Sequence, residues 1–115
     1  MKHEVKKITK IVDEIMTYFL YNHEVQMTDV HVEHINKAFE ITFIFHDLQL
    51  DELEIRDLKK NLGRKRNPEL EDYYWQLTGE AEESNELSLV AMMTDAVEFL
   101  NEDNKVRVML LRKLD

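Results

Sequence analysis

The sequence contains no cysteine, so it has no disulfide framework, no thiolate metal site and no thiol nucleophile. It contains only two glycines, Gly63 and Gly79, which leave little material for a glycine-rich phosphate loop. No apolar run approaches the roughly 18 residues that a membrane-spanning helix needs. The basic N-terminus lacks the apolar segment of a signal peptide. We therefore expect a cytoplasmic protein that does not insert into a membrane.

The composition that remains is that of a small acidic globular protein. The 115 residues suffice for one hydrophobic core, and we expect residues 1–115 to form a single domain. Hydrophobic residues make up 43% of the chain, which is enough to supply that core. The formal net charge of −9 argues against nucleic-acid binding, because such binding requires a cationic surface that displaces phosphate counterions.

Apolar periodicity in the first half of the chain predicts one helix followed by a β-hairpin. From about Glu4 to Asn22, apolar side chains recur at the spacing of one helix face, with charged residues largely opposite. The period then changes to two, first around Val30 and Val32 and again from Phe39 to Phe45. Two such runs on either side of Asn36-Lys37 are typical of an antiparallel hairpin with one buried face.

The middle of the chain predicts three further helices. Asp51 to Arg66 carries an apolar line at helical spacing, which Gly63 weakens near its end. Asn67-Pro68 is a helix-start signal, with asparagine as the N-cap and proline at the first helical position. A third apolar pattern opens at Ser84 and continues at helical spacing as far as Val97.

The end of the chain predicts a second hairpin and completes the fold. Val97 to Leu100 and Lys105 to Leu114 form two candidate strands, with apolar alternation from Val106 to Leu110. The order of elements is therefore α, β, β, α, α, α, β, β. A mainly antiparallel four-stranded sheet of two hairpins, with the helices on one face, would bury both apolar surfaces. We therefore expect an α+β fold of two layers.

Motifs along the chain resemble a known family. Leu87 to Phe99 reads LSLVAMMTDAVEF, and a polar turn and Lys105 to Val108 follow it. This segment resembles the end of the histidine-kinase-like (GHKL, Bergerat-fold) ATPase domains, nearest to the anti-sigma-factor serine kinases. In that family a first helix carries Glu-x-x-x-Asn and a hairpin ends in Asp-x-Gly-x-Gly. Here Glu14 to Tyr18 and Asp47 to Asp51 follow in the same order, so the resemblance implies a Bergerat-like fold.

The residues that depart from the family pattern imply that ATP binding has been lost. The family's magnesium-ligating asparagine corresponds to Tyr18, and glycines of its nucleotide site correspond to Gln49, Ser84 and Glu86. A side chain at such a glycine blocks the approach of backbone N–H groups to phosphate. Asp47 matches the aspartate that accepts a hydrogen bond from the adenine amine. If a nucleotide site is retained, Asp47 and Ser84 would bind ATP with magnesium.

Three functions stay open at this point. The first is a non-catalytic binding or regulatory module without a cofactor. The second is a divergent nucleotide-binding protein or anti-sigma-type kinase that retains a site around Asp47, with Glu14 as the candidate catalytic base. The third is an unrelated small α+β interaction module. Asp47 also has a simpler interpretation as a turn-forming aspartate, and Glu14 as a solvated residue on a polar helix face.

The histidines give no pattern that predicts a metal site. His31 and His34 are three residues apart, which places them on opposite faces of a strand. We therefore expect no metal ligands.

We expect a protein partner and propose a basic and aromatic segment as its interaction surface. Three consecutive aromatic residues on one short helix cannot all face a single core. The candidate surface residues are Lys60, Arg64, Arg66, Tyr74 and Trp75. The alternative is that the aromatic side chains pack within the domain and the basic residues form a solvated helix end. An exposed edge strand, for which the segment from Lys105 to Leu114 is the candidate, could pair across a two-fold axis in a homodimer.

Overall fold

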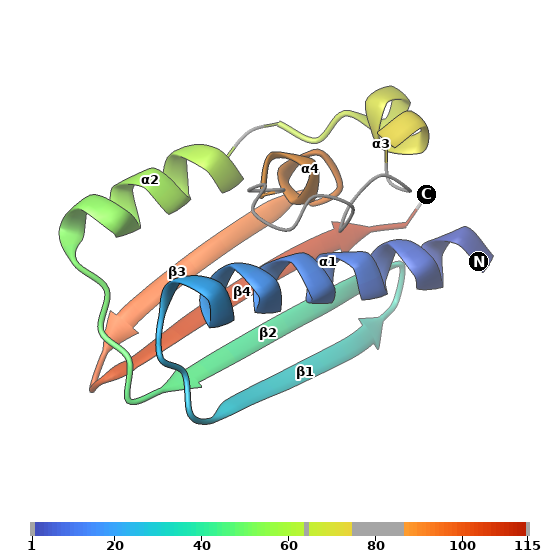
Figure 1. The fold of residues 1–115 in the computed structure, drawn as a ribbon. Helices are drawn as coiled ribbons and strands as arrows, with labels where there is room; N and C mark the ends of the chain where they lie inside the picture. Colours follow the sequence, from blue (N-terminus) through green and yellow to red (C-terminus); the bar gives the residue numbers. More distant parts are fainter. Residues whose placement is uncertain (1, 64, 75–86, 115) are drawn as a thin grey trace.

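The computed structural model describes residues 2–63, 65–74 and 87–114, and it has the α+β architecture that the sequence predicts (Figure 1). Within these residues the elements follow in the predicted order. They are α1 (Lys2–Asn22), β1 (Thr28–Ile35), β2 (Ala38–His46), α2 (Glu52–Leu62), α3 (Pro68–Tyr74), α4 (Leu87–Met92), β3 (Ala96–Glu102) and β4 (Lys105–Lys113). None of the helices described is both long and apolar enough to cross a membrane.

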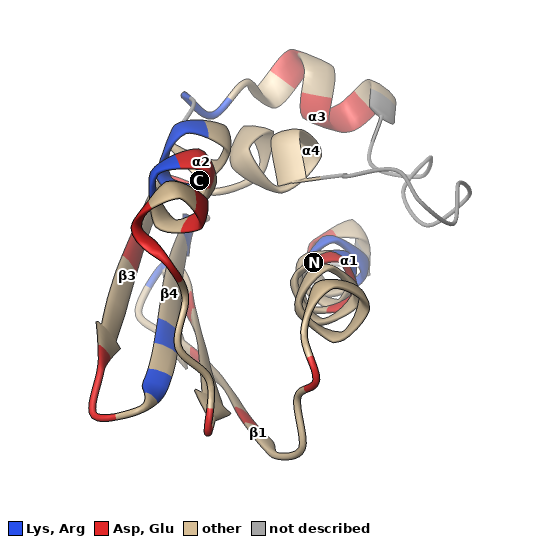
Figure 2. Cartoon of the chain, turned by 60° about the vertical axis from the view of Figure 1, so that its left-hand side comes forward, with Lys and Arg blue, Asp and Glu red and all other residues tan. Residues whose placement is uncertain are grey.

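The strands form one antiparallel four-stranded sheet in the order β1-β2-β4-β3. Both hairpins are present, and the helices gather on one side of the sheet (Figures 1 and 2). On β4 the predicted alternation is confirmed, because Val106, Val108 and Leu110 are all buried. They lie opposite buried residues of β2, with Val108 facing Phe43. This inner face of the sheet is one wall of the core.

The helices supply the other wall of the core. Ile11, Ile15 and Phe19 lie along one face of α1 and are fully buried. The ring of Phe19 stacks on Phe45 of β2, with centroids 4.2 Å apart. The apolar faces of α2 and α4 complete the cluster, which includes Leu58, Leu62, Leu87, Leu89 and Val90. Burying apolar surface from both layers is the main force that holds them together.

Local signals set where the middle helices begin and end. The Asp51 side chain caps α2 by accepting a hydrogen bond from the Glu54 backbone N–H at 2.8 Å. Asn67 caps α3 in the same way through the N–H of Leu70, which confirms the predicted helix start at Asn67-Pro68. Helix α2 is shorter than predicted. It ends at Leu62, and the Gly63 N–H bonds to the Lys59 carbonyl at 2.8 Å.

Two sequence predictions in the C-terminal third are wrong. The last helix ends at Met92 rather than near Val97, and Val97 lies on β3. The segment from Lys105 to Leu114 is not an edge, because β4 lies between β2 and β3. The inner face of β4 is apolar over three consecutive inward positions, whereas β3 has Asn101 among its inward positions. The more apolar strand takes the central place, and the edges of the sheet are β1 and β3.

A buried arginine follows the apolar run of β4. Arg112 occupies the next inward position after Leu110, and only 1% of it is exposed. Its Nε and Nη2 donate to the two carboxylate oxygens of Glu4 at 2.9 and 3.0 Å. Nη2 also donates to Glu71 at 2.6 Å, and Nη1 donates to the Met93 carbonyl at 2.7 Å. Arg112 thus joins β4 to the start of α1, to α3 and to the end of α4.

Glu71 of α3 is the centre of this buried ion cluster. Besides Arg112, it accepts hydrogen bonds from Lys7 Nζ at 2.8 Å and from Arg66 Nε at 3.2 Å. Lys7 also donates to Asp72 at 2.7 Å. Burial alone would raise the pKa of Glu71, but hydrogen bonds from Arg112 and Lys7 outweigh it and lower that pKa to about 2. The cluster holds α3 in place by charge.

Removing the guanidinium of Arg112 should destabilise the domain strongly. An Arg112→Ala variant leaves the buried Glu71 and the partly buried Glu4 with fewer cations, and such a loss costs about 3–5 kcal/mol. Urea unfolding followed by circular dichroism measures the change. Arg107→Ala is the matched control, because Arg107 lies on the same strand but is exposed. Equal destabilisation by the two substitutions would contradict this role of Arg112.

The low pKa of Glu71 makes stability fall in acid. In the unfolded chain this carboxyl has its ordinary pKa near 4.5, so the unfolded state binds the proton more tightly than the folded state. The stabilisation of the folded state by the ionised Glu71 carboxylate is therefore complete above about pH 5, and it is lost as the pH falls toward about 2. Its size is about 3 kcal/mol. Urea midpoints measured across this range should fall less steeply for Glu71→Gln than for the unsubstituted chain. Glu69→Gln, on the exposed side of α3, should leave the slope unchanged.

Candidate functional site

The residues that the family resemblance assigns to a nucleotide site come from α1 and from the end of the first hairpin. Glu14 and Tyr18 lie one turn apart on α1, and Asp47 directly follows β2. Ser84 and Glu86, the expected positions of the phosphate loop, lie outside the described residues. With Gln49, which is exposed two residues after Asp47, the site can therefore be tested at four of its positions.

Tyr18 joins the end of α1 to the start of α2 through a hydrogen bond. Its hydroxyl donates to Glu54 Oε2 at 2.6 Å, and Nε2 of His23 lies 2.7 Å from the same oxygen. Burial, and then the hydrogen bond to Glu54, raises the pKa of Tyr18. The side chain is therefore a neutral phenol that donates to a carboxylate. Magnesium in proteins is bound mainly through carboxylates, substrate phosphates and water, so a phenol committed to Glu54 is poorly suited to ligate it.

Asp47 has the geometry of a turn residue. Its backbone has a φ of 52°, in the left-handed region that aspartate adopts more readily than most residues. Its side chain is exposed, and Oδ1 accepts a hydrogen bond from Asn104 Nδ2 at 3.4 Å. The N–H of Leu48 donates to the Asn104 carbonyl at 3.2 Å, which ties this turn to the turn between β3 and β4. The turn-forming interpretation accounts for these contacts.

Glu14 differs from its simplest sequence interpretation, because it is not solvated. Only 5% of this residue is exposed, although it lies among the charged positions of α1. The two carboxylates that the enzyme hypothesis pairs are therefore in unlike surroundings, one buried on α1 and one exposed in a turn. That arrangement does not by itself define an acid–base pair.

The expected basic and aromatic surface is placed only in part. Lys60 is exposed on α2, as a docking surface requires. Arg66 is turned into the domain, where its Nη1 donates to Asp95 at 2.9 Å and to the Lys113 carbonyl at 2.9 Å. Tyr74 is the last residue of α3, whereas Arg64 and Trp75 lie outside the described residues. Arg66 therefore stabilises the fold instead of facing a partner.

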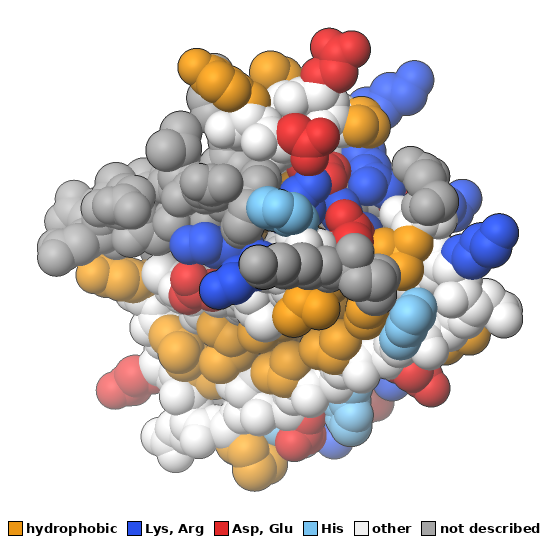
Figure 3. Space-filling view, turned by 90° about the vertical axis from the view of Figure 1, so that its right-hand side faces the viewer, with side chains coloured by type: hydrophobic (Ala, Val, Ile, Leu, Met, Phe, Trp, Pro, Cys, Tyr) orange, Lys and Arg blue, Asp and Glu red, His pale blue; other side chains and the backbone are white. Residues whose placement is uncertain are grey.

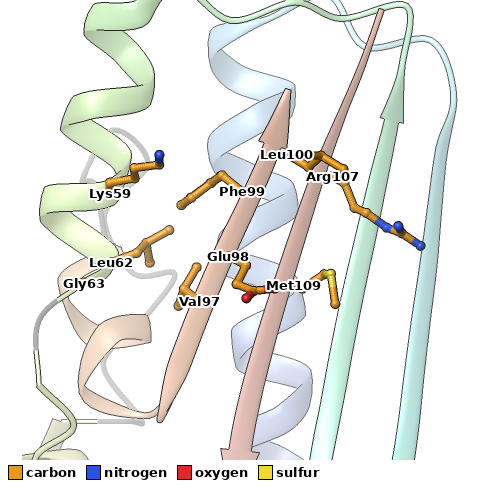
Figure 4. Close-up of a pocket in the computed structure, with 9 residues that line it drawn as sticks. All are labelled: Lys59, Leu62, Gly63, Val97, Glu98, Phe99, Leu100, Arg107 and Met109. Atoms are coloured by element: carbon orange, nitrogen blue, oxygen red, sulfur yellow. The ribbon is translucent and has the colours of Figure 1, made fainter. Parts of the chain in front are cut away.

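A cavity of about 490 Å³ lies where α2 meets the edge strand β3 (Figure 4). Val97 and Phe99 point toward Leu62 of α2 and form its apolar part. Its charged residues are Lys59, Glu98 and Arg107. The Arg107 side chain extends across the sheet away from Lys59, so the lining does not gather its charges around one point (Figure 4).

An apolar groove between α1 and β1 is the feature that sequence reasoning missed. It has a volume of about 440 Å³, and its lining is almost wholly apolar. Figure 3 shows a band of hydrophobic side chains on the same side of the molecule. Val30 and Val32 of β1 are 39% and 48% exposed there. The residues that line the groove are Val5, Ile8, Thr9, Val12, Val30, Val32 and Phe39.

Metal chemistry and comparison with known proteins add no further assignment. In the part of the chain that the structure describes, no three histidine, aspartate or glutamate side chains are grouped so that they could hold a metal ion. Neither the protein-family models nor the curated proteins that were searched match this sequence. The function is therefore argued from the geometry of the chain itself.

Removing the hydroxyl of Tyr18 should loosen the contact between α1 and α2. Tyr18→Phe deletes a hydrogen bond to a carboxylate, and bonds of that kind contribute about 1.5–3 kcal/mol. The loss is measured as a shift in the urea midpoint. Tyr21→Phe is the matched control, because Tyr21 is 65% exposed on the same helix. The assignment fails if the two variants are equally stable.

Proposed function

We propose that this chain is a non-catalytic binding or regulatory module, built on a histidine-kinase-like ATPase fold, that no longer binds ATP. It acts in the cytoplasm through a protein partner and not as an enzyme. The observation that carries the proposal is the Tyr18–Glu54 contact, which stands where the family resemblance expects a magnesium ligand. The absence of cysteine fits a reducing compartment.

The charge around Tyr18 supports the loss of nucleotide binding. Glu54 carries its carboxylate 2.6 Å from the phenol oxygen, and Asp51 and Asp57 lie near enough to raise the pKa of Tyr18 further. Negative groups repel a polyphosphate unless a metal ion offsets them. The phenol at the expected ligand position supplies no charge to hold such an ion, and the Glu54 oxygen beside it already accepts from Tyr18 and lies 2.7 Å from Nε2 of His23.

The exposure of Asp47 supports the same conclusion. A carboxylate that selects adenine must be held inside a pocket that also covers the base, because solvent competes for an exposed acceptor. Asp47 is instead exposed in a turn and bonded to Asn104. Gln49, at a position where the family has glycine, is exposed beside it.

Titration with ATP and with a fluorescent ATP analogue, each with and without magnesium, tests the proposal. We expect no saturable binding and no rise in the unfolding temperature. A ligand present at 100 times its Kd would stabilise the folded state by about 2.7 kcal/mol, which thermal unfolding detects readily.

Two variants make this titration specific. Saturable, magnesium-dependent binding that Asp47→Ala abolishes would overturn the proposal in favour of a retained nucleotide site. Asp103→Ala is the control, because Asp103 is another exposed turn residue with positive φ and has no expected role in adenine recognition. Binding that both substitutions weaken equally would be attributed to altered turns, and binding that neither weakens would place a nucleotide elsewhere on the chain. Either result would also contradict the proposal.

A further inference from the structure

Strand β1 is a long sheet edge that carries the charged residues Asp29 and Glu33 but has no lysine, proline or bulge. Among the described residues it pairs only with β2, and seven of its eight residues are exposed. Natural edge strands are commonly blunted by lysine, proline or a bulge, or covered by another element. The sequence of β1, TDVHVEHI, contains no lysine or proline, and its register against β2 is continuous from Thr28 to Ile35. The other edge, β3, lies beside α2, which packs against it.

The direction of the backbone groups on β1 follows from its pairing. The N–H of His46 donates to the carbonyl of Met27 at 3.0 Å, so the backbone of residue 27 faces β2. In an antiparallel ladder, residues alternate between facing the partner strand and facing away from it. The odd-numbered residues of β1 therefore bond to β2. The even-numbered residues, Val30, Val32 and His34, direct their N–H and C=O groups to the open edge.

We propose that a second copy of this chain pairs with β1 antiparallel, across a two-fold axis at Val32. Each even-numbered residue then meets an even-numbered residue of the partner, so the outward backbone groups bond reciprocally. Even-numbered side chains all lie on the inner face of the sheet, so the helices of both copies stay on the same side. The two sheets become one continuous sheet. This interface does not depend on the fate of the nucleotide site.

The side chains that each possible axis places opposite one another favour the axis at Val32 over axes at the neighbouring residues. With the axis at Val32, His31 on the outer face meets the partner's Glu33, and a histidine donates readily to a carboxylate. An axis at His31 would place Asp29 opposite the partner's Glu33. An axis at Glu33 would place two glutamates face to face, and like charges directly opposite destabilise a sheet. An axis at Val30 would pair a shorter part of the strand.

The apolar groove beside β1 supplies the rest of the interface. Val32 meets the partner's Val32 on the inner face, directly below the exposed side chains of α1. Val5 on α1 is 54% exposed and lines the same groove as Val30 and Val32. Pairing of β1 with a second copy brings two such grooves together, so the exposed apolar residues of each copy are buried against those of the other.

Sedimentation equilibrium and light scattering test the oligomeric state. We expect a dimer whose dissociation follows mass action. Val32→Pro should give a folded monomer, because the N–H of Val32 faces the open edge and is not part of the ladder with β2. Val97→Pro on β3 is the matched control, since its register partner Leu110 bonds to β2 and the N–H of Val97 therefore faces the other open edge of the sheet. We expect it to leave the dimer intact wherever the chain stays folded. A monomer for the unsubstituted chain at high concentration would overturn the proposal.

Oxidative cross-linking tests the axis itself and does not depend on the proline variant folding. The chain has no cysteine, so a single introduced thiol reports only on its own position. Across a bonded antiparallel pair the Cα atoms lie about 5.5 Å apart, within the range that a disulfide spans. Val32→Cys should therefore form a disulfide-linked dimer. In Val30→Cys, the control, the two thiols would lie about 14 Å apart along the strand and should not link.

Each outcome of the cross-linking decides the proposal. Linking by Val32→Cys but not by Val30→Cys supports the axis at Val32. Efficient linking by Val30→Cys alone would place the two-fold axis at Val30. Linking by neither variant would indicate that β1 pairs with an extended segment of another protein instead of a second copy. Both of these results would overturn the dimer as stated.

Discussion

The contact between Arg112 and Glu71 is the constraint on which the arrangement of the layers depends. It joins the last strand to α3, on which Leu70 is 41% and Tyr73 is 74% exposed. Burying charges costs free energy, and the cost is offset only where every charge has partners of good geometry. Glu71 has three cationic donors and Arg112 has three acceptors, so the pair meets that condition. The position of α3 therefore depends on this buried charge.

The same cluster fixes one end of α1, and Tyr18 fixes the other. Glu4 and Lys7 bind Arg112 and Glu71 at the start of the helix, while Tyr18 binds Glu54 of α2 near its end. Between these points the apolar face of α1 packs on the sheet. A helix held at both ends and along its length cannot move aside to admit a ligand without breaking buried polar contacts. This restraint is the physical reason to look for binding on the surface of the domain.

The sequence predicts well where helices and strands form, and poorly which of them lie side by side in the fold. Periodicity identified both hairpins, and Asn67-Pro68 correctly marked the start of α3, because these features depend on local residues. The central position of β4 was missed, since alternation within a strand does not encode which strand lies beside it. The end of α4 was misplaced because Val97 fits both helical and strand spacing. Arg112 had a usable signal, as the next inward position after Leu110, but its partners lie on distant parts of the chain.

Hydrogen bonding differs between the described interior and the edge of the sheet. At the edge, backbone N–H and C=O groups of β1 have no partner strand in the described part of the chain. Among the residues described, every buried side-chain nitrogen and oxygen has a hydrogen-bond partner. On β1, by contrast, alternate backbone groups face outward next to an apolar groove. Backbone groups bonded only to water exchange readily for bonds to another strand, and the exposed valines gain by burial when they do. Strand β1 therefore combines open backbone groups with exposed apolar side chains, which is the combination that a pairing strand can use.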